Sequence, residues 1–245
     1  MAFAGRLVES DLSPAAWLPT ALAPGATVGS LVPPGFPAYG RVFHPAVRYV
    51  RDDDLEVTWA EVAAANGTTA HPLMQWGSIT GSFEYFENDD QAPIWHGAPA
   101  RGHLPVPVAQ RLVAVLRRHT ATAADCWFGV DAELGDPTAS APTLDLPRGS
   151  FWLLRGPIEL AAANLADEPA EQSAGLGWPA ARAWVVATDA DLVSSYIAGS
   201  AACIAAILAA DDLEAAPAEP GQRVTGDADR VNPPPAEALD LPGHG

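Results

Sequence analysis

Two aspartates directly follow an apolar segment in the last third of the chain. Asp189 and Asp191 come after residues 182–187, which read Arg-Ala-Trp-Val-Val-Ala and predict a strand. Groups at the ends of strands face crevices in open sheets. These carboxylates, together with Tyr196 and a histidine, are therefore candidates for acid–base catalysis in a hydrolase-like site. Three histidines are candidates for that partner: His119, His44 and His71.

The same residues also have a structural interpretation, which we weigh above a catalytic one. Asp189 and Asp191 fit a charged turn that leads into a helix. Ser194 and Ser200 follow the strand and fit helix caps. The chain has no Gly-x-Ser-x-Gly turn of the kind that presents a nucleophilic serine.

Other site chemistry lacks its usual residue pattern. The histidines have no close-spaced pair such as His-x-x-x-His, so no metal site is predicted. All 13 basic residues are arginine, which excludes a phosphate-binding loop built on lysine. A dinucleotide-binding glycine pattern is absent as well, and we predict no cofactor. Cys126 and Cys203 lie in apolar surroundings and are expected to be small buried hydrophobic residues.

The elements that must position these residues predict an α+β fold. Continuous apolar runs at 126–130, 150–154 and 182–187 are typical of central strands covered on both faces. Helices are expected near 58–66, 106–118 and 200–209. Thr58 and Glu61 have the spacing of a capping box, and residues 106–118 have helical apolar periodicity. We predict a mixed, mostly antiparallel central sheet packed by three or four helices.

The predicted organisation is a single domain with a tail. Residues 1–214 contain all the expected strands and helices. From 215 to 245, Pro, Gly, Glu and Asp dominate, which predicts a loosely held C-terminal tail.

Residues 177–200 read Gly-Trp-Pro-Ala-Ala-Arg-Ala-Trp-Val-Val-Ala-Thr-Asp and, after one alanine, Asp-Leu-Val-Ser-Ser-Tyr-Ile-Ala-Gly-Ser. This segment resembles a family of uncharacterised actinobacterial proteins with the pattern Trp-Pro-x-x-Arg-Ala-Trp, Ala-Thr and Ser-x-Tyr-x-x-Gly-Ser. Segments 32–45 and 119–128 are similar too, so the resemblance covers most of the chain. It implies no activity, but it makes 178–200 the place to look for binding residues. The candidates there are Trp178, Arg182 and Ser195.

Composition and charge restrict the partners. Hydrophobic residues make up 49% and charged residues 18%, which is typical of a folded chain, and the net charge is −17. Such a charge argues against nucleic acid and against an anionic membrane surface, while a basic protein partner is compatible with it. The first residues do not form a signal peptide, so a cytoplasmic location is expected.

These observations predict a non-catalytic, acidic binding or regulatory protein of the cytoplasm, of the toxin-immunity type for example. The alternative is the hydrolase-like enzyme with a carboxylate and histidine site at the end of the strand 182–187.

Overall fold

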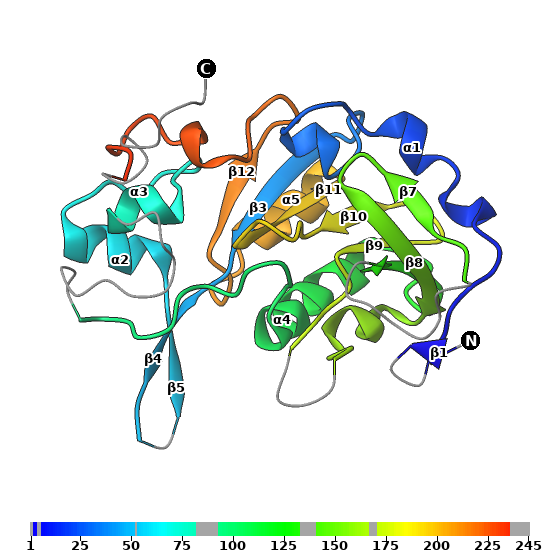
Figure 1. The fold of residues 1–245 in the computed structure, drawn as a ribbon, viewed down its shortest axis with the longest axis horizontal. Coiled ribbons are helices and arrows are strands. Elements are labelled where there is room, and N and C mark those ends of the chain that lie inside the picture. Colours follow the sequence, from blue (N-terminus) through cyan, green and yellow to red (C-terminus); the bar gives the residue numbers. More distant parts are fainter. Residues whose placement is uncertain are drawn as a thin grey trace.

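An eight-stranded sheet runs through the molecule, and all its neighbouring strands are antiparallel. The computed structural model describes residues 2–3, 6–51, 53–81, 93–132, 141–166 and 171–235. The strand order is β12-β3-β11-β10-β9-β6-β8-β7 (Figure 1). The predicted α+β class with a mostly antiparallel sheet is confirmed. The strands of this sheet are β3 (Ala38–Phe43), β6 (Cys126–Asp131), β7 (Leu144–Leu146), β8 (Gly149–Gly156), β9 (Leu176–Pro179), β10 (Trp184–Ala187), β11 (Ser194–Gly199) and β12 (Ala215–Ala218).

The three apolar runs do form central strands. β6 and β8 pair antiparallel, with Phe128 opposite Leu154, and β10 supplies the third run. The other strands of the sheet lie outside the three predicted runs; among them, β9 lies between β6 and β10. Its Gly177 and Pro179 are poor strand formers, and the pairing partners on both sides decide its conformation.

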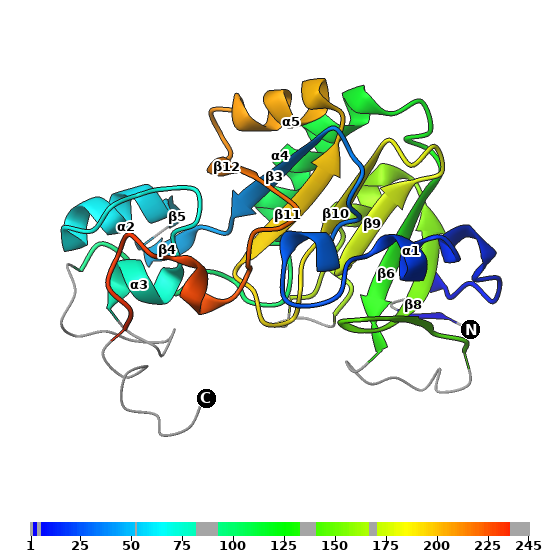
Figure 2. The same cartoon turned by 90° about the horizontal axis from the view of Figure 1, so that it is seen from above.

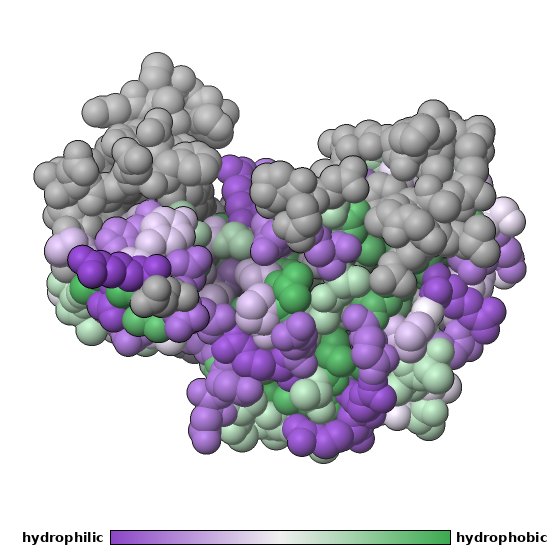
Figure 3. Space-filling view, turned by 90° about the horizontal axis from the view of Figure 1, so that it is seen from below, coloured by the Kyte–Doolittle hydropathy of each residue, from purple (hydrophilic) through white to green (hydrophobic). Residues whose placement is uncertain are grey.

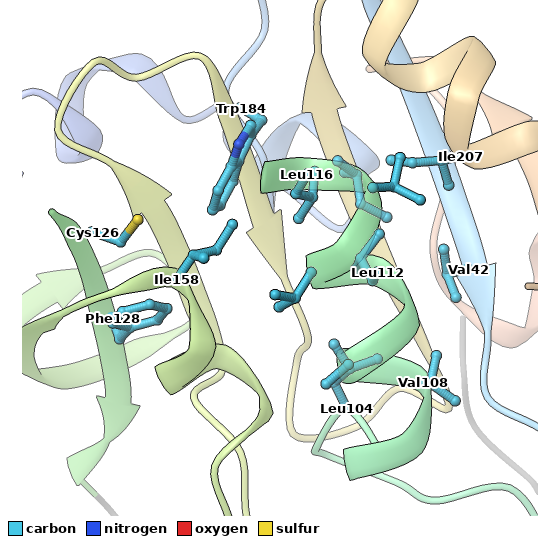
Figure 4. Packing of buried hydrophobic residues seen from close by; sticks show 14 of the residues in the cluster. Val42, Leu104, Val108, Leu112, Leu116, Cys126, Phe128, Ile158, Trp184 and Ile207 are labelled. Carbon is cyan, nitrogen blue, oxygen red and sulfur yellow. The ribbon is translucent and has the colours of Figure 1, made fainter. Parts of the chain in front are cut away.

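Two helices and a short 3-10 helix cover one face of the sheet (Figure 2). They are α4 (Val106–Leu116), α5 (Ala201–Leu208) and η5 (Ile158–Ala162). Val108, Leu112 and Leu116 repeat at helical spacing and point from α4 toward the sheet, where Trp184 and Ile207 join them (Figure 4). The predicted helices 106–118 and 200–209 therefore exist, and their apolar sides form the larger core.

The N-terminal segment covers the opposite face. It contains η1 (Ser13–Ala15), α1 (Leu18–Ala21) and η2 (Val28–Ser30), and Leu18 and Val28 pack there against Val185 and Tyr196. Strand residues alternate between the two faces, so Trp184 and Val185 belong to different clusters. Ahead of this segment, β1 (Ala2–Phe3) and β2 (Arg6–Leu7) form a separate two-stranded sheet.

A third cluster lies beside the sheet edge. Helices α2 (Trp59–Asn66) and α3 (Trp76–Thr80) pack there with the base of a hairpin formed by β4 (Ala46–Tyr49) and β5 (Asp54–Val57) (Figure 1). The predicted capping box is present: Glu61 N donates to Thr58 Oγ1 at 3.2 Å, and Thr58 N donates to the Glu61 carboxylate at 2.8 Å. Helix α2 thus starts where predicted, but it packs on α3 beside the sheet.

The C-terminal segment departs from the predicted tail. Residues 215–218 form β12 and pair with β3 at the sheet edge, where Pro217 is tolerated because an edge strand needs no second partner. A 3-10 helix, η6 (Gly226–Ala228), follows, and Val224 is buried. The segment is held by contacts with remote strands that composition does not reveal. Residues 236–245 of the predicted tail lie outside the described residues.

Asp229 fastens this segment to the third cluster. Its side chain is fully buried and accepts hydrogen bonds from His71 Nε2 at 2.9 Å, from Gln75 N at 3.2 Å, and from Asn232 N and Nδ2 at 2.9 Å each. Val231 N donates to it as well, at 3.0 Å. Burial on its own would raise the pKa of the Asp229 carboxyl, but the hydrogen bonds outweigh burial and hold that pKa below its usual range.

Replacing Asp229 should therefore destabilise the fold. We expect Asp229→Ala to lower the free energy of unfolding by about 3 kcal/mol, because it leaves several buried donors without an acceptor. Urea unfolding followed by tryptophan fluorescence measures this change. Asp227→Ala is the matched control, since the Asp227 side chain is 57% exposed, and it should cost less than about 1 kcal/mol. Equal losses for the two variants would contradict a special role for Asp229.

Candidate functional site

Asp189, the first predicted catalytic residue, is engaged in a structural ion pair. Its two carboxylate oxygens accept from Arg148, one from Nε and the other from Nη2 at 2.8 Å. The Asp189 side chain is only 7% exposed. The pair joins the turn after β10 to the turn between β7 and β8, so this carboxylate has no free proton-transfer role.

Asp191 and Tyr196 lie in different surroundings. Asp191 is at the surface, 73% exposed, and pairs with Arg101 Nη2 at 2.9 Å. Tyr196 is buried in β11, on the face covered by the N-terminal segment. The exposed ion pair of Asp191 contributes at most about 1 kcal/mol to stability. Asp191 and Tyr196 do not line a common cavity among the three described.

His119 lies at the other end of the sheet from Asp189. It ends the 3-10 helix η3 (Arg117–His119), shortly before β6 begins at Cys126. Cys126 lies opposite Pro179 of β9, and the register of β9 with β10 puts Pro179 next to the first residue of β10. Asp189, in contrast, comes after the last residue of β10. The length of the four-residue β10, about 13 Å, therefore separates the level of Cys126 from that of Asp189. The structure therefore does not bring the predicted catalytic set together.

The binding candidates Trp178 and Arg182 hold the N-terminal segment on the sheet. Trp178 is buried, and Trp17 meets its ring edge-on at a centroid distance of 6.3 Å. Arg182 is exposed and lies over the ring of Trp17, with its guanidinium carbon 4.7 Å from the ring centroid. Arg182 also has a positive φ of 51°, which closes the turn before β10. Trp17 thus contacts both residues, and both pack the N-terminal segment against the sheet.

Ser195, the third binding candidate, belongs to a buried polar chain with His44. His44 Nδ1 lies 2.7 Å from the carbonyl oxygen of Ala100, and His44 Nε2 lies 2.9 Å from Ser195 Oγ. Because a carbonyl only accepts, Nδ1 carries the proton of the neutral ring and Nε2 accepts from Ser195. Thr188 Oγ1, 2.5 Å from Ser195 Oγ, then donates to it. The chain of hydrogen bonds runs from Thr188 through Ser195 and His44 to Ala100.

This Ser–His pair has the geometry of an activated nucleophile but no access to solvent. His44 and Ser195 are both 0% exposed, and neither lines any of the three cavities described here. Burial lowers the pKa of His44 to about 4; the hydrogen bond to Ala100 opposes this shift, and the charge of Arg41 adds to it. His44 is thus neutral at pH 7 and holds β3 to β11.

Arg41 is a buried residue that the sequence did not single out. Its guanidinium donates to Ser194 Oγ at 3.0 Å and to the carbonyl oxygen of Met74 at 2.8 Å, and it lies 4.5 Å from the ring centroid of Phe43. Ser194 is therefore a strand residue that accepts from Arg41, and the predicted helix cap at that position is wrong. Ser200 does cap a helix, since Cys203 N donates to its Oγ at 3.1 Å. The sequence signal that could have identified Arg41 is an arginine within a run of strand-forming aromatic residues.

A cleft between the hairpin, α2 and α4 is the largest cavity described, with a volume of about 360 Å³. We call it the acidic cleft, since four carboxylates and one guanidinium line it over an apolar floor. The floor includes Phe43, Val108 and Leu213, which are buried. The charged residues are Glu56, Asp211, Asp212, Glu214 and Arg111.

Three of these five charged residues already have partners within the protein. Arg111 Nη2 donates to Glu56 at 2.6 Å, and Arg111 Nε donates to the carbonyl oxygen of Pro107 at 3.1 Å. Glu214 accepts from the backbone N–H groups of Trp59 and Ala60, at 2.6 and 2.8 Å, at the start of α2. Burial raises the pKa of Glu214, and these two bonds oppose the shift. The helix start is thereby closed to external anions, while Asp211 and Asp212 remain exposed.

Other kinds of site find no support in the described ranges. No three His, Cys, Asp or Glu side chains gather there in a way that could hold a metal ion. None of the helices in this part of the chain is long and apolar enough to cross a membrane. Burial raises the pKa of both cysteines, Cys126 and Cys203, to about 11, in agreement with their predicted apolar surroundings. Comparison with protein-family models, curated proteins and solved structures found no match.

The buried His44 predicts a loss of stability in acid. Its pKa is about 4 in the folded protein and about 6.5 when unfolded, so the unfolded chain takes up the proton first as the pH falls. The contribution of His44 to the free energy of unfolding is therefore fully present above about pH 6.5. It is lost progressively as the pH falls to about 4, by roughly 3 kcal/mol in total.

Urea unfolding of the wild type and of His44→Gln, measured between about pH 7 and pH 4, separates this contribution from those of other groups. The variant keeps an acceptor for Ser195 but cannot titrate, so its stability should fall less steeply with acid. Parallel curves for the two proteins would show that His44 does not titrate as inferred.

Proposed function

We propose that the protein is a non-catalytic, acidic binding protein of the cytoplasm, and that its acidic cleft receives a cationic side chain of a basic protein partner. The observation that carries the proposal is the cleft itself, in which four carboxylates face one guanidinium above an apolar floor. A toxin-immunity protein that covers a basic toxin is one form of this function.

The size and chemistry of the cleft support this proposal. A volume of about 360 Å³ lies within the range of small-molecule and side-chain sites. The apolar floor suits the methylene groups of arginine or lysine, and Asp211 and Asp212 at the rim suit the charged end of either side chain. The net charge of −17 would also accelerate encounter with a basic protein.

A hydrolase-like function has one observation in its favour, the 2.9 Å contact between His44 and Ser195. Because both residues are 0% exposed, a substrate reaches Ser195 only after the sheet opens. Asp189, the predicted acid of that site, is also bound to Arg148. We therefore prefer the binding function.

Neutralising the rim of the acidic cleft should weaken cation binding. We expect Asp211→Asn/Asp212→Asn to bind fluorescein-labelled octa-arginine about tenfold more weakly at low salt, since two partly screened charge pairs contribute about 0.5–1 kcal/mol each. Fluorescence anisotropy at low and at high salt measures the affinity and its screening.

The matched control is Asp145→Asn/Glu219→Gln, which removes the same charge from two exposed residues outside the cleft. It should change the affinity by less than about twofold. If both double variants lose affinity equally, overall charge accounts for binding and the cleft has no particular role.

A further inference from the structure

The hairpin formed by β4 and β5 carries an unusual share of exposed apolar surface. Of the five large hydrophobic side chains found exposed in the described part of the chain, three lie on it: Tyr49 at 59%, Val50 at 47% and Leu55 at 41%. The hairpin projects from the body of the molecule (Figure 1). On the face toward which it projects, hydrophobic and hydrophilic residues lie interspersed (Figure 3). Projecting apolar side chains of this kind are typical of interaction surfaces.

The two edges of the hairpin differ. The outer edge of β4 is occupied by residues 96–97: Val47 N donates to Gly97 O at 2.8 Å, and His96 N donates to Val47 O at 2.7 Å. Tyr49 adds a ring stack on His96 at a centroid distance of 5.8 Å. In contrast, β4 is the sole strand that pairs with β5 within the described ranges. We call the other side of residues 54–56 the β5 edge; it offers backbone groups to an added strand.

The carboxylates of β5 determine which kind of strand can pair with the β5 edge. Asp54 and Glu56 are exposed on either side of Leu55. If a second copy of this chain paired antiparallel about Leu55, Asp54 of each copy would face Glu56 of the other. Directly opposed like charges are destabilising, so this edge discourages self-association. A strand with basic residues at those two positions would instead form an opposite-charge pair with Asp54 and would share the Glu56 carboxylate with Arg111.

We propose that the β5 edge binds an extended, basic segment of the partner protein as an additional strand. Backbone hydrogen bonds would supply affinity, and alternate basic side chains opposite Asp54 and Glu56 would supply specificity. Glu56 belongs both to the β5 edge and to the lining of the acidic cleft, so the two surfaces are continuous. The inference deepens the proposed function and rests on a basic partner, but it assigns the backbone contact to a separate element.

Backbone methylation of a peptide tests strand addition without altering the protein. The probe is a capped, fluorescein-labelled peptide of alternating arginine and valine, starting and ending with arginine. Successive N–H groups of a strand point to opposite edges, so methylating three valine amides blocks one edge and methylating three arginine amides blocks the other. We expect one isomer to bind about tenfold more weakly than the parent, and the other to bind within about threefold of it.

The two isomers carry the same charge and the same number of methyl groups, so they control for each other. Similar affinity of both isomers, whether equal to that of the parent or equally weakened, would overturn strand addition. If peptide binding still depended on Asp211 and Asp212, the proposed function of the acidic cleft would stand without strand addition. If one isomer bound more weakly than the other and binding did not depend on Asp211 and Asp212, strand addition at the β5 edge would stand. The proposed role of the acidic cleft would then be contradicted. Sedimentation of the free protein as a dimer would favour a second copy as the occupant.

A side-chain variant gives a second measurement. Leu55→Ser removes exposed apolar surface from the β5 edge and should weaken parent-peptide binding about threefold, without unfolding the protein. The matched control is Val231→Ser, since Val231 is 62% exposed and lies outside the hairpin. Hydrogen exchange at residues 54–56 should slow when the parent peptide binds, and unchanged exchange there would contradict the proposal.

Discussion

The pairing of β3 with β11 is the contact on which most of this structure depends. It aligns residues 38–43 with 194–199 in an unbroken six-residue register, although the two strands are more than 150 positions apart. Once β3 is in place, its other side accepts β12 and so gives the C-terminal segment a position. Helix α5, which follows β11 directly, then packs back across β3 and β12. A shift of one residue would turn every side chain of β3 to the wrong face.

The same register satisfies the buried polar groups. It places Arg41 beside Ser194 and His44 beside Ser195, so that each finds a hydrogen-bond partner where no solvent reaches. Buried polar groups without partners are costly, and these pairs therefore favour one register over its neighbours. Polar residues that might otherwise suggest catalysis are used in this protein to fix the sheet.

The charged surface is organised by the elements at the sheet edge. The hairpin with the adjoining α2, helix α4 and the turn after α5 come from three separate parts of the chain and meet at the acidic cleft. Glu214 belongs to the structure as well as to the cleft, because it holds the first N–H groups of α2. The surface that we propose for binding is thus supported by a rigid sheet and a capped helix, which is a favourable basis for a defined partner site.

The sequence by itself determined the fold class, the three central strands, the helices 106–116 and 201–208, and the capping box of Thr58 and Glu61. These features depend on apolar periodicity and on side chains within four residues of one another, which a single sequence displays. The tertiary structure decided β9, β12 and the fate of every candidate site residue. Asp189 meets Arg148 and Ser195 meets His44 only because distant strands align, and no local pattern records such pairings. The acidic cleft was likewise invisible in the sequence, since its carboxylates converge only after the chain has folded.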